Sequence, residues 1–153
     1  MERDWRISHS MKKLGTITLG IGLPLAIVLF GTITEWRYVY IEDGPDDFLY
    51  GFPFPFICRG WHTSLSHQVF ILELFVDLLV YLVICVAILF TVDRFVVPIK
   101  TGRKPKFILY GLASLVLIYY GIVFSNPDNI FRLKRDFNYQ QIKTGFKFVW
   151  QDN

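Results

Sequence analysis

The chain has 153 residues, of which 53% are hydrophobic, 18% aromatic and 19% charged, with a formal net charge of +3. A soluble domain of this length ordinarily carries about 25% charged residues. The small positive excess is not gathered into a basic stripe, which argues against nucleic acid as a partner. Because the charges avoid three long stretches, the composition predicts one α-helical integral membrane domain.

The first uncharged stretch covers 14–33 and reads LGTITLGIGLPLAIVLFGTI. As a helix it would extend ~30 Å, which matches the hydrocarbon core of a bilayer. Its four glycines allow another helix to approach closely, and Pro24 predicts a kink. Basic residues precede it without a typical cleavage site, so we expect a retained transmembrane helix.

The connection 34–68 combines a strand pattern with an irregular segment. Residues 35–41, EWRYVYI, are β-branched and aromatic, and the turn sequence EDGPD follows at once. This pattern predicts a β-strand. Residues 51–67 contain two prolines among Phe and Trp, which favours a loop lying along the membrane interface.

The second apolar stretch, 69–97, is longer than one span requires, so we expect it to tilt or to project from the membrane. Ser64 or Ser66 is the predicted N-terminal cap of this helix. Pro98 favours its end, because the residue before a proline is pushed out of the helical region.

Two acids inside this stretch, Glu73 and Asp77, are four residues apart and therefore share one helical face. An Asp at the centre of a span costs ~2.5–3.5 kcal/mol, so intramembrane acids are usually functional or specifically bonded. Three roles remain open for this pair: a structural polar contact, a contact with another subunit, and ion or proton transfer.

A second candidate group, His62, Ser64 and His67, precedes this helix. The histidines could bind zinc with Glu73, and Ser64 with a histidine could form a nucleophile pair. Neither an HExxH spacing nor a third catalytic member is present. We therefore expect capping and interfacial hydrogen bonds in an extracytoplasmic cap, and we assign no catalytic residue, cofactor or metal.

The second connection is basic, and it leads into the third apolar stretch, 107–124. Its cations are predicted to face lipid head groups, where each contributes ~1 kcal/mol, and to act as a topology signal. They are Arg94, Lys100, Arg103, Lys104 and Lys106. Near the far end of 107–124, Tyr119 and Tyr120 resemble an interfacial aromatic belt.

The tail 125–153 has strand character as well. Residues 146–150, FKFVW, alternate in polarity, and 137–139 form a candidate earlier strand with 140–145 as the turn. A lone hairpin is marginal in water, whereas three strands are more stable. We therefore expect 34–68 and 125–153 to form one small cap of β character.

Basic residues in the N-terminal tail and in the second connection predict that both lie in the cytoplasm. The acidic first connection then lies outside. Three spans place the C-terminal tail outside too, although that tail is itself basic. We expect the bacterial cytoplasmic (inner) membrane. Cys58 and Cys85 should lie at different depths, so we expect no disulfide between them.

Three helices make a thin bundle with little room for an ion or proton pathway within one chain. We therefore expect a non-enzymatic accessory or structural subunit of a larger membrane protein complex, whose partners are the lipid bilayer and other membrane subunits. One alternative is a homo-oligomeric ion or proton carrier that uses Glu73 and Asp77. Another is a small membrane enzyme with a site near His62, Ser64 and His67.

Overall fold

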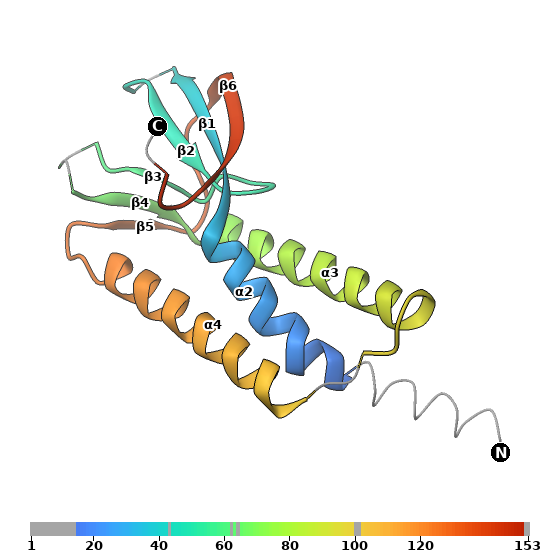
Figure 1. The fold of residues 1–153 in the computed structure, drawn as a ribbon. Helices are drawn as coiled ribbons and strands as arrows, with labels where there is room; N and C mark the ends of the chain where they lie inside the picture. Colours follow the sequence, from blue (N-terminus) through green and yellow to red (C-terminus); the bar gives the residue numbers. More distant parts are fainter. Residues whose placement is uncertain (1–14, 43, 62, 64, 100–101, 152–153) are drawn as a thin grey trace.

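The computed structural model describes residues 15–151 except 43, 62, 64, 100 and 101. Within these residues, three helices are long and apolar enough to cross a membrane, and a six-stranded mixed β-sheet lies at one end of them (Figure 1). The helical stretches are Gly15–Thr32, Ile71–Phe95 (α3) and Arg103–Phe124 (α4). The predicted number of apolar helices is confirmed.

The helix ends differ from the predicted ones. The predicted helix 69–97 is two residues too long at each end, because its first two residues belong to a β-strand and its last two follow the helix. Capping by Ser66 is wrong, because its hydroxyl donates to the Thr63 carbonyl at 3.0 Å in a turn; Ser64 lies outside the described residues. The third helix begins earlier than predicted, at Arg103, and so includes basic residues.

The first helix changes its hydrogen-bonding pattern along its length. A π-helical turn, η1 (Thr18–Gly22), precedes the α-helix α2 (Leu23–Thr32), and Pro24 is near the start of α2. Proline has no N–H to bond to the carbonyl four residues earlier, and a π turn is one way in which a helix absorbs such a gap. The kink predicted at Pro24 stays a prediction, and the structure shows a π-helical turn just before this residue.

Glycines in the first helix allow the other two helices to pack closely against it. A Cβ added to Gly22 would lie 3.1 Å from Val86 of α3, and one added to Gly31 would lie 2.1 Å from Val116 of α4. The predicted close approach is confirmed at these two positions, and it takes place within the chain.

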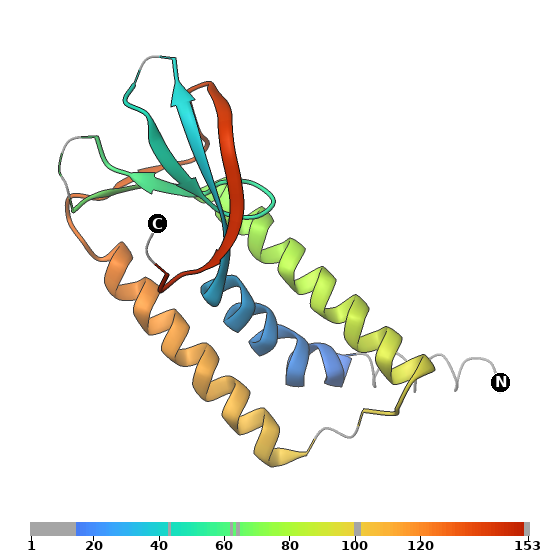
Figure 2. The ribbon, with the colours of Figure 1, turned by 45° about the horizontal axis from the view of Figure 1, so that its top comes forward.

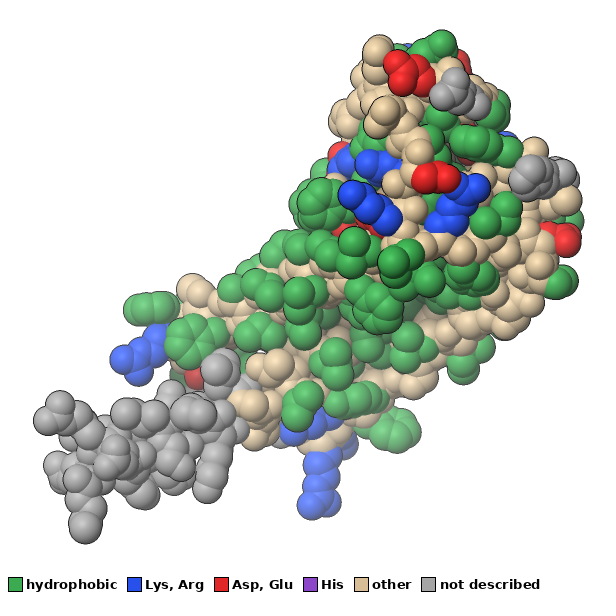
Figure 3. Space-filling model, turned by 180° about the vertical axis from the view of Figure 1, so that it is seen from behind, with side chains coloured by type: hydrophobic (Ala, Val, Ile, Leu, Met, Phe, Trp, Pro, Cys, Tyr) green, Lys and Arg blue, Asp and Glu red, His purple; other side chains and the backbone are tan. Residues whose placement is uncertain are grey.

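The first helix lies between the other two (Figures 1 and 2). α3 and α4 each pack along α2 and make no substantial contact with each other in the described part of the chain. In the most apolar 18 residues of each helix, the buried share is 39% for the first helix, 11% for α3 and 6% for α4. The outer helices therefore expose a broad hydrophobic surface (Figure 3).

Both polar segments contribute strands to one sheet, with the order β5-β4-β3-β2-β1-β6. Neighbouring strands are antiparallel, except for the parallel pair β4 and β5. The strands are β1 (Ile33–Ile41), β2 (Asp47–Tyr50), β3 (Ile57–Arg59), β4 (His67–Phe70), β5 (Ile130–Arg132) and β6 (Tyr139–Phe148). The prediction that the two segments form a cap together is confirmed.

The sheet is larger than the predicted cap, and the hairpin predicted in the tail is wrong. Residues 137–150 do not fold back at 140–145; instead β6 runs continuously and pairs with β1 from Ile33↔Phe148 to Ile41↔Tyr139. The segment 140–145 lacks the Asn-Gly or Asp-Gly signal of a tight hairpin. The long strand β1 offers a partner along its full length, interrupted by one bulge.

One face of the sheet carries the hydrophobic core. Its buried members come from four strands, and Phe137 and Tyr139 of the tail pack against them. They are Val39, Ile41, Leu49, Cys58 and Phe70, each exposed by 1% or less. Because side chains alternate along a strand, the neighbours of these residues point to the opposite face. The face with the core is called the filled face, and the opposite face, which also has buried members such as Val69, is called the open face.

Candidate functional site

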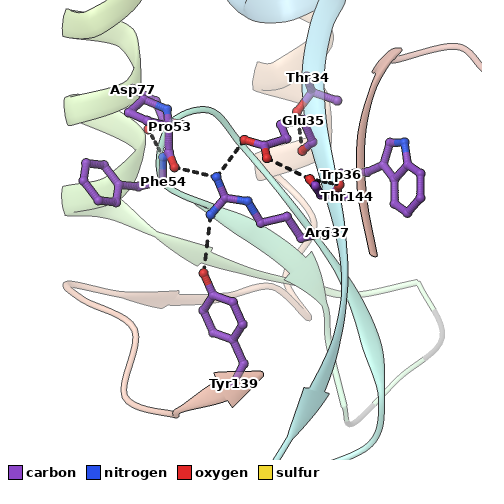
Figure 4. Close-up of polar contacts among 9 residues, drawn as sticks. All are labelled: Thr34, Glu35, Trp36, Arg37, Pro53, Phe54, Asp77, Tyr139 and Thr144. Carbon is purple, nitrogen blue, oxygen red and sulfur yellow. Dashed lines mark hydrogen bonds and ion pairs between the residues drawn. The ribbon is translucent and has the colours of Figure 1, made fainter. Parts of the chain in front are cut away.

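The loop between β2 and β3 folds down onto the start of α3. Gly51 begins it with φ +139°, a conformation that favours glycine, and a Cβ there would lie 2.5 Å from the Phe54 carbonyl oxygen. The loop directs the Phe54 N–H to the Asp77 Oδ1, at 2.9 Å (Figure 4). The Asp77 side chain is fully buried. Asp77 therefore anchors the first part of the segment 51–67, which was predicted to be an irregular loop but contains β3 and the first residue of β4.

An arginine joins the same loop to the sheet. The Arg37 Nη2 donates to the Glu35 Oε2 and to the Pro53 carbonyl, each at 2.7 Å, and Nη1 donates to the Tyr139 hydroxyl at 3.4 Å. The Thr144 hydroxyl donates to the other oxygen of Glu35 at 2.8 Å. Figure 4 shows these groups converging from β1, β6 and the loop. Together they form a partly buried polar joint.

The charges of this joint are held by opposing effects. Burial raises the pKa of Glu35, but hydrogen bonds from Arg37 and Thr144 and the charge of Arg37 lower it, and the net pKa lies below its usual value of 4.5. For Arg37, burial lowers the pKa, but Glu35 and Tyr139 raise it above its usual value. Glu35 and Arg37 therefore form a charged pair at neutral pH.

Glu73 holds a different segment. It lies in the first turn of α3, where the helix N-terminus favours an anion. Its Oε1 accepts a hydrogen bond from the Arg135 N–H at 3.3 Å, and the neighbouring Leu72 N–H donates to the Leu133 carbonyl at 3.0 Å. The Arg135 guanidinium lies 4.6 Å from the Tyr139 ring centroid. Glu73 therefore attaches the tail to the start of α3.

The two acids thus connect α3 to two different segments. Asp77 binds the loop, and Glu73 binds the tail. Each keeps one buried oxygen, Asp77 Oδ2 and Glu73 Oε2, that has no hydrogen-bond partner among the described residues. One turn beyond Asp77, the Tyr81 hydroxyl donates to the Ile33 carbonyl at 3.0 Å. This geometry is that of a joint between sheet and helices; ion or proton transfer stays a prediction.

The predicted group His62, Ser64 and His67 is visible only at His67, since the other two lie outside the described residues. The backbone N–H of His67 donates to the Asn129 Oδ1 at 2.9 Å, and its Nδ1 is buried without a hydrogen-bond partner in the described chain. This hydrogen bond attaches the first residue of β4 to the turn that follows α4.

The predicted basic connection lies at the end of the helices away from the sheet. Arg94 is in the last turn of α3, where the helix C-terminus favours a cation. Arg103 and Lys104 are exposed. Lys106 instead packs on the first helix, because a Cβ added to Gly20 would lie 2.8 Å from its side chain. Lys100 lies outside the described residues.

The described residues contain no cluster of three or more His, Cys, Asp or Glu side chains that could hold a metal ion. Cys58 and Cys85 are both buried and unpaired. Burial, with the nearby charge of Asp47, raises the pKa of Cys58 to about 12. The Cys58 thiol is therefore protonated at neutral pH, which makes it a poor nucleophile.

A cavity of about 470 Å³ lies between the open face of the sheet and the end of α4. Its sheet side carries the basic side chains of Arg59 and Lys147 and the imidazole of His67, among uncharged side chains such as those of Thr34, Tyr50 and Ile57. Its helix side consists of Tyr119, Tyr120 and Val123 from α4. This arrangement places positive charge and apolar surface in one concavity.

Sequence reasoning missed the joint around Arg37. Tyr139 lies 102 residues from its partner Arg37 in the chain, and Thr144 lies 109 residues from its partner Glu35. A local signal was present, because Glu35 and Arg37 are two residues apart in the predicted strand and therefore face the same side.

No protein-family model, curated protein or solved structure matches the chain. What the protein does is therefore inferred from its own geometry.

Proposed function

We propose that the protein is a small integral membrane protein that serves as a non-enzymatic accessory or structural subunit of a larger membrane protein complex. Its three helices cross the bilayer. The N-terminus and the basic connection lie in the cytoplasm, and the sheet lies on the extracytoplasmic side of a bacterial inner membrane. Helices of 18, 25 and 22 residues correspond to ~27–37 Å, which is enough to span the hydrocarbon core.

The arrangement of the helices carries this proposal. In the described part of the chain they lie side by side in the order α3, α2, α4, with α2 packed between the other two. The outer helices expose large apolar side chains, such as Phe75, Leu79 and Leu115. Lys and Arg side chains gather at both ends of this hydrophobic surface (Figure 3), as expected for the rims of a membrane-embedded region.

Two glycines of α4 support a helical partner. A Cβ added to Gly111 or to Gly121 would have no atom within 4 Å, and both residues are exposed. They lie within ~80° of each other around the helix. Glycine inside a helix costs ~1 kcal/mol relative to alanine, and membrane helices use it where another helix packs closely. In the first helix this neighbour is part of the chain; at Gly111 and Gly121 it is not among the described residues.

The hydrogen bonds of Asp77, Glu73 and Arg37 support a rigid platform. They attach the loop, the tail and the sheet to the ends of the helices, so the sheet keeps a defined position above them. β6 is an edge strand of ten residues, and its outer backbone groups are available to a further strand. A partner could therefore contact the helices and the sheet together.

The test is the native mass of the protein after mild detergent extraction from its own membrane. We expect a species much heavier than the 17.9 kDa chain. The double variant Gly111→Leu/Gly121→Leu should release the chain, because leucine fills the contact without clashing inside the monomer. Gly15→Leu, which also has no atom within 4 Å of its Cβ, is the matched control and should leave the complex intact. A wild-type chain that runs alone would exclude the proposal.

The two other functional hypotheses have separate tests. A carrier that uses the α3 acids should lose flux into liposomes in Glu73→Gln/Asp77→Asn, and unchanged flux would exclude it. An enzyme with a site near His62 should lose its activity in His62→Ala, and retained activity would exclude that assignment.

A further inference from the structure

The cavity at the open face of the sheet lies where the sheet meets the helices. Its helix side is formed by Tyr119, Tyr120 and Val123, in the last two turns of α4, which ends at Phe124. Tyr119 is 52% exposed. In a membrane-spanning helix, tyrosines near one end lie at the depth of the lipid head groups. The cavity therefore opens at head-group depth if α4 spans the bilayer.

The sheet side of the cavity is positively charged. Arg59 of β3 pairs directly with His67 of β4, so their side chains lie on the same face. No Asp or Glu is among the described residues that line the cavity. Arg59 makes no side-chain hydrogen bond with the described residues, and its charge interacts with that of Asp47. Lys147 lies 4.7 Å from the Tyr50 ring centroid and adds a second charge.

Two further observations narrow the class of ligand. His67, which lines the cavity, has a buried Nδ1 without a hydrogen-bond partner in the described chain. The volume of about 470 Å³ lies within the range of small-molecule sites, ~300–1,000 Å³. A ligand that complements this lining places an anionic group near Arg59 and Lys147 and apolar groups against the aromatic and aliphatic side chains.

We propose that this cavity binds the phosphodiester head group of an anionic phospholipid of the surrounding leaflet. The Arg59 guanidinium donates two parallel hydrogen bonds to the phosphate oxygens, and Lys147 adds charge. Val123 and the α4 tyrosines contact the glycerol and the first acyl carbons. This inference rests on the helices crossing a membrane, and it does not depend on a partner subunit.

Native mass spectrometry of the delipidated full chain in mild detergent tests it, with phosphatidylglycerol and phosphatidylcholine of the same acyl chains as probes. We expect one tightly bound phosphatidylglycerol and weaker binding of phosphatidylcholine. Arg59→Gln/Lys147→Gln should weaken phosphatidylglycerol binding by ~30-fold, since each basic residue near a lipid surface contributes about fivefold. The matched control Arg103→Gln/Lys104→Gln, at the other end of the helices, should change it by less than about threefold.

Val123→Trp, which fills the cavity and keeps its charges, should also weaken binding, so the test does not depend on the folding of one variant. Far-UV circular dichroism establishes that each variant is folded. Equal affinity for the two lipids, or an equal loss in the two charge pairs, would overturn the proposal. Displacement of the lipid by millimolar glycerol phosphate would show that the site takes a soluble phosphate compound and would also overturn it.

Discussion

Asp77→Ala should lower the free energy of unfolding by about 2–3 kcal/mol, whereas Asp77→Asn should lower it by less than about 1 kcal/mol. The difference follows from what Asp77 does in the structure. Its Oδ1 accepts the Phe54 N–H at 2.9 Å, and its side chain is fully buried. Asparagine keeps an oxygen at this position, and alanine removes it.

The magnitude comes from two contributions in Asp77→Ala. The hydrogen bond itself is lost, and the Phe54 N–H is left without its acceptor, which costs about 1–3 kcal/mol. A small cavity adds to this cost. In Asp77→Asn the amide oxygen can still accept the Phe54 N–H, so most of this cost is avoided.

The measurement is reversible unfolding in mixed micelles by titration with a denaturing detergent, followed by far-UV circular dichroism. Asp128→Ala, at an exposed turn after α4, is the matched control and should change stability by less than about 0.5 kcal/mol. If Asp77→Asn were as destabilising as Asp77→Ala, the charge and not the loop anchor would be what matters. If Asp77→Ala left the free energy of unfolding unchanged, the anchoring role would be refuted.

Three further predictions concern the joint and the packing. The pKa of Glu35 is below its usual 4.5 in the folded chain, so its stabilising contribution is present above about pH 4.5 and is lost as the pH falls through the lowered pKa. Arg37→Gln should reduce this loss. The free energy of unfolding, measured between about pH 3 and 7, tests it. Gly31→Ala should destabilise by ~1–3 kcal/mol, because its Cβ would lie 2.1 Å from a side chain of α4, whereas Gly111→Ala should be neutral or stabilising; equal effects in the same detergent titration would contradict this packing. Cys58 should react with a maleimide only after unfolding, because its thiol is buried and its pKa is about 12; rapid labelling of the folded chain would show that the core is open there.

The helices could be predicted because their signal is local. Uncharged runs such as 14–33 and 107–124 need no distant partner to be recognised. Their ends were less predictable: 69 and 70 continue the apolar run, yet they pair with β3 and β5 as part of β4. At that boundary the sheet competes with the helix for the same hydrophobic residues.

The hydrogen-bond partners of the two acids in α3 could not be predicted from the sequence. Glu73 and Asp77 could be singled out, because acids inside an apolar helix are costly. Their partners could not, because the Phe54 N–H and the Arg135 N–H are backbone groups whose positions depend on the whole sheet. The same holds for β6, whose pairing with β1 joins segments about 100 residues apart.

The most direct test of the account is the side of the membrane on which each end of the helices lies. Asp128→Cys marks the sheet end, and Arg103→Cys marks the basic connection; both positions are exposed, whereas Cys58 and Cys85 are buried. In intact bacterial cells, a membrane-impermeant maleimide should label the cysteine at 128, and it should reach the one at 103 only after permeabilisation. Labelling of both in intact cells, or of position 103 alone, would contradict three membrane-spanning helices with the sheet outside.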